Sequence, residues 1–103
     1  MAIQQTITLE KPAGSFSEQE EAIASIRSLI DSSVLTVIDN ARNSGDFTTV
    51  ADWDPVAQQI TFVRTWNEDA YNAYNTAIAD SSADGIANLE ANGWTITQSV
   101  ATV

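Results

Sequence analysis

The side chains that could do chemistry in this chain are few, because both histidine and cysteine are missing from its 103 residues. Without cysteine the chain cannot build a disulfide, a thiolate nucleophile or a thiolate metal centre. Without histidine it lacks the commonest transition-metal ligand and the usual general base near neutral pH. Serine–histidine triads and histidine-ligated haem are therefore excluded. Carboxylates, a few arginines and aromatic rings remain.

The aromatic residues form the first candidate ligand site. Trp53, Trp66 and Trp94 each fall at the start or end of an expected strand, and Tyr71 and Tyr74 fall on an expected helix. Such side chains can line the mouth of a pocket and stack on a ligand. Core packing is the commoner role of aromatic residues at strand and helix spacing, and it is the interpretation that we favour.

Arg64 is the most unusual charge in the sequence, because it shares the strand parity of Phe62 and Trp66. A guanidinium on the helix-facing side of a sheet is partly buried and needs a carboxylate or a bound anion. We expect an internal ion pair, for example with Asp52 across a hairpin or Asp69 on the next helix, in preference to ligand recognition.

The acidic residues outnumber the basic ones by 14 to 4, which gives a formal net charge of -10. This charge repels phosphate backbones and anionic lipids, so we expect binding neither to nucleic acid nor to membrane surfaces. Asp52 and Asp54, with Glu68 and Asp69, are compatible with a hard cation, but turn and helix-cap chemistry explains them more simply. We predict no metal, no cofactor and no catalytic residue.

The first half of the chain predicts a strand followed by a helical region. Residues 3–9 alternate with the period of a half-buried strand, which the segment 11–14 ends. Ser17 and Glu20 fit a capping box, after which apolar residues recur every three or four positions. The β-branched run at 33–43 fits either strand or helix; the continuing stripe favours a helix, with a kink or restart capped by Ser33 and a stop at Gly45.

The second half predicts a hairpin, a helical region and a last strand. Residues 47–53 and 58–66 are the hairpin strands, because 54–57 has turn chemistry. Asn67 is the expected cap of the next helix, which breaks at 80–82. A short helical piece then ends at Gly93, and 94–103 alternates as a strand.

These elements predict one α+β domain over residues 1–103, with the order β-α-β-β-α-β. This is the ferredoxin-like arrangement, in which helices cover one face of a four-stranded antiparallel sheet. Small polar residues collect around Val63 on the other face, where either solvent or a moderately polar dimer interface would suit them. These residues are Thr6, Thr8, Thr61, Thr65, Thr95, Thr97 and Ser99.

Between Phe62 and Tyr71 an expected strand ends in a tryptophan and passes directly into an acid-capped helix. In this pattern the chain resembles the dimeric α/β-barrel proteins related to antibiotic-biosynthesis monooxygenases. The resemblance implies a homodimer packed sheet against sheet, with a pocket for a small aromatic or carbonyl ligand. Trp66 matches the core tryptophan of the monooxygenases, but the first strand carries Gln4 and Gln5 where these enzymes typically have asparagine. Cofactor-free oxygenation is therefore unsupported, and the missing histidine argues against haem degradation.

Three functions are compatible with these observations. The first is a small acidic binding or interaction module without evident catalysis, homodimeric through its sheet. The second is a dimeric α/β-barrel enzyme or binder of a small hydrophobic ligand, favoured by any pocket of roughly several hundred Å³ between sheet and helices. The third is a phage-encoded accessory protein that docks on a basic host protein. The candidate pocket residues are Trp66, Arg64, Tyr71, Tyr74, Trp94 and Trp53.

Neither a signal-peptide core at the start of the sequence nor a membrane-spanning apolar stretch is evident. We therefore expect a soluble, cytoplasmic protein, of a cell or of an infected host.

Overall fold

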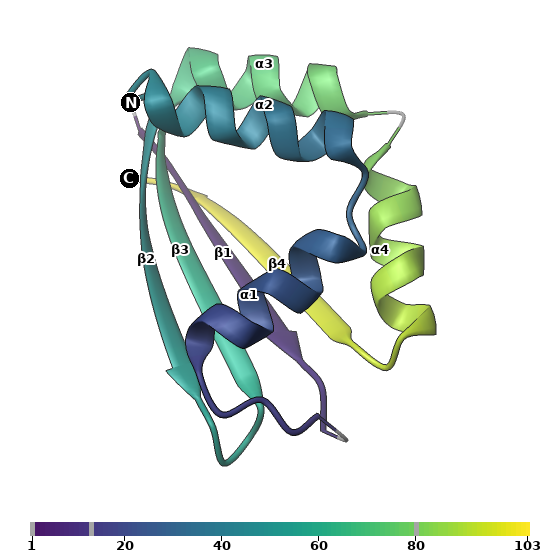
Figure 1. The fold of residues 1–103 in the computed structure, drawn as a ribbon. Coiled ribbons are helices and arrows are strands. Elements are labelled where there is room, and N and C mark those ends of the chain that lie inside the picture. Colours follow the sequence, from purple (N-terminus) through teal and green to yellow (C-terminus); the bar gives the residue numbers. More distant parts are fainter. Residues whose placement is uncertain (1, 13, 80) are drawn as a thin grey trace.

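The computed structural model describes residues 2–12, 14–79 and 81–103, which form one antiparallel sheet of four strands together with four helices (Figure 1). The predicted ferredoxin-like α+β class is confirmed, and each of the two expected helical regions is divided into two helices, near the predicted restart and the predicted break. In chain order the elements are β1 (Ala2–Glu10), α1 (Gln19–Ser28), α2 (Ser32–Asn43), β2 (Phe47–Asp54), β3 (Gln59–Asn67), α3 (Glu68–Ile78), α4 (Ser82–Ala91) and β4 (Thr95–Thr102).

The strands lie in the order β2-β3-β1-β4, so β1 and β3 are central. Ile3 on β1 lies opposite Trp66 on β3, which places both side chains on the same face of the sheet. The helices cover that face, and α2 and α3 lie side by side near the chain ends (Figure 1). The start of β1 lies beside the residue that follows β4, since the Val103 amide donates a hydrogen bond of 2.9 Å to the Ala2 carbonyl.

The alternation expected for the first strand is confirmed. Ile3, Gln5, Ile7 and Leu9 are all buried beneath the helices. The strand ends at Glu10, and a turn follows in which the amide of Gly14 donates to the carbonyl of Lys11. Ala13, part of the predicted stop signal, lies outside the described residues.

The ambiguous segment 33–43 is helical and belongs to α2, as the apolar stripe predicted. Its predicted cap was wrong, because Asp31 and not Ser33 occupies the cap position. The Asp31 carboxylate accepts hydrogen bonds from the Ser33 amide (2.8 Å) and hydroxyl (2.7 Å). The hydrogen bond from the Ser33 side chain is the main reason that the pKa of Asp31 lies below its usual value.

The predicted capping box at the start of α1 is also absent from the described residues. The Ser17 hydroxyl donates to the carboxylate of Glu21, at 2.6 Å, and not to a backbone group of the first turn. The N-cap residue of α1 is Glu18, whose side chain makes no capping hydrogen bond. The pattern of Ser17 and Glu20 therefore predicted the start of the helix correctly, but the capping hydrogen bonds that it predicted were wrong.

The predicted glycine stops are confirmed. Gly45 and Gly93 follow α2 and α4 with φ angles of 77° and 89°, a region that side chains with a Cβ rarely adopt. The amide of Gly93 donates to Glu90 and the amide of Trp94 donates to Leu89. This pair of bonds is a Schellman motif, which satisfies the last carbonyls of the helix.

The hairpin and the following helix also form where the sequence predicted them. Asp54 closes the turn by accepting hydrogen bonds from the amides of Val56 (3.0 Å) and Ala57 (3.1 Å). Asn67 caps α3 by accepting from the Asp69 amide at 3.0 Å. Asp80, in the predicted break, is not among the described residues. Within the described ranges no three acidic side chains gather closely enough to hold a metal ion.

The core is divided into two clusters. The α2–α3 cluster consists of Ile3, Val34, Ile38, Phe47, Trp66, Tyr74 and Ile78. The α1–α4 cluster consists of Ile7, Leu9, Ala22, Ile26, Ile60, Leu89 and Trp94. In the parts of the chain that the structure describes, no helix has the length and apolar character needed to cross a bilayer.

Candidate functional site

A cavity of about 250 Å³ lies between the sheet and the helices. We call it the inner cavity. Its apolar wall draws on both core clusters, with Val34, Ile38 and Ile78 from one and Ile7 and Leu89 from the other. Its polar lining residues are Gln5, Arg64, Tyr71, Tyr74, Asn75, Ser81, Ser82 and Gln98. A mostly apolar hollow with a few converging polar groups is typical of small-molecule sites.

Gly85 on α4 keeps part of this space open. It is buried and lines the inner cavity, and a Cβ atom built on it would meet no atom within 4 Å beyond its chain neighbours and the backbone of its own helix. Glycine inside a helix is unfavourable by about 0.5–1 kcal/mol relative to alanine. Its backbone needs no glycine here, so the residue costs helix stability and leaves volume in the cavity.

Arg64 lies on β3, opposite Gln5 on one side and Thr49 on the other, and lines the inner cavity. Its guanidinium carbon is 5.6 Å from the ring centroid of Phe47 and 5.8 Å from that of Phe62. Both distances are within the range of cation–π attraction. The guanidinium is therefore held between aromatic rings on the helix-facing side of the sheet, as its parity predicted.

Neither of the ion pairs expected for Arg64 forms among the described residues. Asp52 cannot reach it, because Asp52 pairs with Thr61 and so points to the opposite face of the sheet. Burial lowers the pKa of the Arg64 guanidinium, and interaction with the Tyr74 hydroxyl partly opposes that shift. Burial also raises the pKa of Tyr74, which Arg64 partly opposes. Burial outweighs the effect of Arg64, so the pKa of Tyr74 stays above its usual value and Tyr74 is a neutral phenol beside the Arg64 guanidinium.

Gln5 is the polar residue that the sequence analysis did not select as a site. Only 4% of it is exposed, and its side-chain carbonyl accepts a hydrogen bond of 3.1 Å from the indole of Trp66. Its amide group donates to Gln98 at 3.4 Å, so Gln5 joins the core tryptophan to the cavity wall. The sequence did contain a signal for this role, because Gln5 is a polar residue on the apolar face of the first strand, between Ile3 and Ile7.

The aromatic candidates separate into two groups. Tyr71 and Tyr74 line the inner cavity, and the ring of Trp66 packs against that of Tyr74, with centroids 4.8 Å apart and planes tilted by 31°. Trp53 and Trp94 belong to the other end of the sheet, where both pack against the ring of Phe16. Neither is among the cavity-lining residues that the structure describes. Their indole N–H groups are buried without a described partner.

A second hollow, which we call the outer groove, has a volume of about 740 Å³ and lies over β2 and β3 beside α1 and α2. Arg27, Arg42 and Arg64 all line it, and Asp39 is the only carboxylate among its described lining residues. It shares part of its wall with the inner cavity. The shared residues are Ile26, Ile30, Ile38, Phe62 and Arg64.

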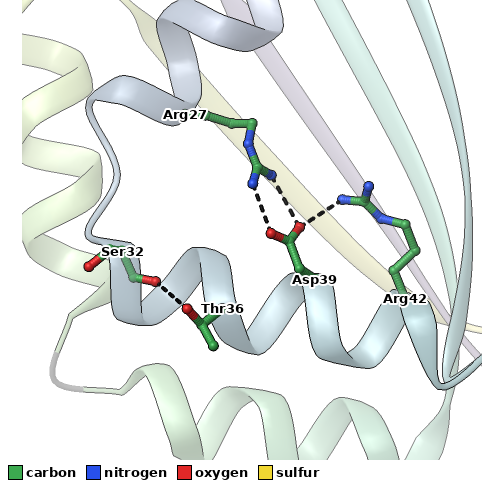
Figure 2. Close-up of polar contacts among 5 residues, drawn as sticks. All are labelled: Arg27, Ser32, Thr36, Asp39 and Arg42. Carbon is green, nitrogen blue, oxygen red and sulfur yellow. Dashed lines mark hydrogen bonds and ion pairs between the residues drawn. The ribbon is translucent and has the colours of Figure 1, made fainter.

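Figure 2 shows Asp39 between two of these arginines. Arg27 donates to both carboxylate oxygens of Asp39, at 3.3 and 2.9 Å, and Arg42 donates to one of them at 3.4 Å. The hydrogen bonds from Arg27 are the main reason that the pKa of Asp39 is lowered. Asp39 thus ties α2 to α1 and neutralises part of the positive charge in the outer groove.

Comparison with known proteins finds similarity in structure but not in sequence. No protein-family model and no curated protein matches the sequence. A candidate antibiotic biosynthesis monooxygenase from Deinococcus radiodurans is 16% identical, with a TM-score of 0.59 over 100% of this chain and 92% of its own. Two dimeric ferredoxin-like proteins from uncultured marine organisms have TM-scores of 0.57 and 0.56. The first is 11% identical over 99% of this chain and 94% of its own. The second is 14% identical over 100% of this chain and 94% of its own.

These matches confirm the predicted resemblance at the level of the fold. Identities this low carry no information about activity, because one fold supports many functions.

Proposed function

We propose that this protein is a homodimeric α/β-barrel domain that binds a small, largely apolar molecule in the inner cavity. The observation that carries the proposal is the cavity of about 250 Å³, with apolar walls and a cluster of polar groups around Arg64. An apolar cavity of about 150 Å³ accommodates benzene. The inner cavity therefore suits a single ring with a few further atoms.

Binding is favoured over catalysis by the chemistry of the lining. Among the described residues that line the inner cavity there is no carboxylate, imidazole, thiol or amine. Its serines and tyrosines have no neighbouring general base to activate them near neutral pH. We therefore assign no catalytic residue, and we place Arg64, Tyr71 and Tyr74 in the ligand site, with Trp66 packed against Tyr74.

Self-association through the open face of the sheet is the second part of the proposal. Two proteins with similar folds are described as dimeric. In this chain Val63 lies between Thr6 and Val50 at the centre of the face without helices. A face of threonine and valine is β-prone and moderately polar, which suits a sheet-to-sheet interface.

The cavity is tested by filling it at Gly85. Gly85→Leu would place a side chain in the open volume, so we expect a folded protein that binds single-ring compounds at least tenfold more weakly than the wild type. Gly85→Ala is the matched control. It should raise the free energy of unfolding by about 0.5–1 kcal/mol and change affinity only a few-fold.

A fragment set of single-ring compounds is screened by thermal shift, and hits are measured by isothermal titration calorimetry on all three proteins. Unchanged affinity in folded Gly85→Leu would show that the compounds bind elsewhere. That result would end the proposal.

A further inference from the structure

The basic residues of this acidic chain are unevenly distributed. Of the four basic side chains, three line the outer groove, namely Arg27, Arg42 and Arg64. Among the described lining residues of the outer groove, Asp39 is the one carboxylate that opposes their positive charge. The fourth, Lys11, lies over the rings of Phe16 and Trp94 and lines neither hollow in the described structure. A chain with net charge -10 therefore keeps a positive region beside its cavity.

Arg64 is one of the five described residues that line both hollows, and the only one of these five that carries a charge. Aromatic rings and one phenol surround its guanidinium, and no described carboxylate pairs with it. The positive charge of Arg42 acts on it as well, since it contributes to the lowered pKa of Arg64. A guanidinium offers five donors, and repulsion from a second arginine adds to the cost of its burial. An anion bound here would accept hydrogen bonds from the guanidinium and would offset both the cost of its burial and the repulsion from Arg42.

We propose that the ligand is an amphipathic carboxylate whose apolar body occupies the inner cavity and whose carboxylate group is bound by Arg64. Arg42 and Arg27 add positive potential from the outer groove. The planar guanidinium matches a carboxylate with two parallel hydrogen bonds, which a neutral amide cannot reproduce. This inference rests on the proposed ligand-binding function and specifies the chemical class of the ligand.

The experiment compares one acid with its neutral isostere. Binding of 4-phenylbutyrate and of 4-phenylbutyramide is measured by calorimetry to the wild type and to Arg64→Met, Arg42→Gln and Lys11→Gln. We expect the wild type to bind the acid at least about tenfold more tightly than the amide, since hydrogen bonds to charged groups are strong. Arg64→Met should remove this preference, because the methionine side chain cannot form the paired hydrogen bonds to the carboxylate.

The other two variants separate a local effect from the net charge. Both remove one positive charge, but only Arg42 lines the outer groove. Arg42→Gln should weaken binding of the acid by about two- to threefold, and Lys11→Gln should leave it unchanged. Equal weakening by both would show a general effect of net charge and would overturn the assignment to the groove.

The remaining outcomes distinguish this inference from the proposed function. If the wild type binds acid and amide equally, the inference is overturned and the cavity is still a ligand site. If neither compound binds at millimolar concentration, the proposed function fails and the inference fails with it. Thermal unfolding without ligand is the folding control: Arg64→Met should be at least as stable as the wild type, because it replaces a desolvated charge with an apolar side chain. A less stable but folded variant that keeps the preference for the acid would assign Arg64 a purely structural role.

Discussion

At the scale of single residues, the polar groups on the helix-facing side of the sheet differ in how well they are paired. Gln5 uses both ends of its amide, accepting from Trp66 and donating to Gln98. Asp39 is paired with two arginines at once. Arg64 has aromatic neighbours in place of a described carboxylate. The well-paired groups stabilise the fold, and the poorly paired one is the group that the proposed ligand would stabilise most.

Replacing Asp39 should lower the stability of the fold and raise the affinity for the proposed ligand. Asp39→Asn should lower the free energy of unfolding at neutral pH by up to about 1 kcal/mol, because the ion pairs are partly exposed. The same change should raise the affinity for 4-phenylbutyrate about two- to fivefold, since Arg27 and Arg42 no longer face a carboxylate. Asp52→Asn, on the opposite face, is the control for net charge and should leave both quantities nearly unchanged. Weaker binding by folded Asp39→Asn would contradict the proposed competition.

The pH dependence of this effect follows from the lowered pKa of Asp39. In the folded protein the carboxylate titrates below its usual value of 3.8, so its contribution to stability is present above that pH. It is lost as the pH falls through the lower, folded-state pKa. The free energies of unfolding of the wild type and Asp39→Asn, measured in urea, should therefore differ at neutral pH and converge as the pH falls below the usual carboxylate range.

At the scale of elements, local signals determine where helices begin and end, and the breaks between helices leave room for the cavity. α1 and α2 separate after Ser28, and α3 and α4 separate after Ile78. Ser81 and Ser82, at the start of α4, line the inner cavity, as do Gly85 and Ile86 within it. The divided core therefore follows from two interrupted helical regions over one continuous sheet.

The cap of α3 gives an element-scale prediction. Asn67→Ala removes the side-chain oxygen that accepts from the amides of Asp69 and Ala70, so we expect the free energy of unfolding to fall by about 1 kcal/mol. Asn72→Ala makes the same chemical change at an exposed position inside α3 and should raise stability by about 0.5 kcal/mol. Denaturant unfolding of both variants tests the pair. Equal effects of the same sign would exclude Asn67 as an energetically important cap.

At the scale of the whole molecule, net charge and the open sheet face act against each other. Each chain carries a net charge of -10, so two copies repel each other, whereas the threonine and valine surface favours sheet packing. Salt screens charges over about 10 Å at 0.1 M. Self-association should therefore strengthen as salt concentration rises.

The proposed dimer is tested at the centre of the open face. Val63→Asp adds a charge to a half-buried position between two other strands and should shift the protein to monomer in sedimentation equilibrium. Val56→Asp adds the same charge in the hairpin turn, where 94% of the side chain is exposed, and should not. A wild-type protein that is monomeric at high salt and high concentration would contradict the dimer. The cavity proposal would be unaffected.

The sequence by itself determined the features that depend on neighbouring residues. Alternation over residues 3–9, turn chemistry at Asp54, the cap at Asn67 and the stop at Gly93 all act within one or two turns of chain, so their patterns predicted the elements and the fold class. The missing cysteine and histidine likewise excluded whole classes of chemistry without reference to a structure.

Only the tertiary structure decided what these elements bring together. Asp52 was expected near Arg64, but the hairpin register pairs it with Thr61, and a shift of one residue in a strand reverses the face of a side chain. The meeting of Arg27, Arg42 and Arg64, and the open volume beside Gly85, depend on how separate helices pack over the sheet. A pattern along the chain records the period of each element but not the distance between elements. For that reason the chain's sequence predicted a partly buried arginine, and its fold decided that this arginine faces a cavity.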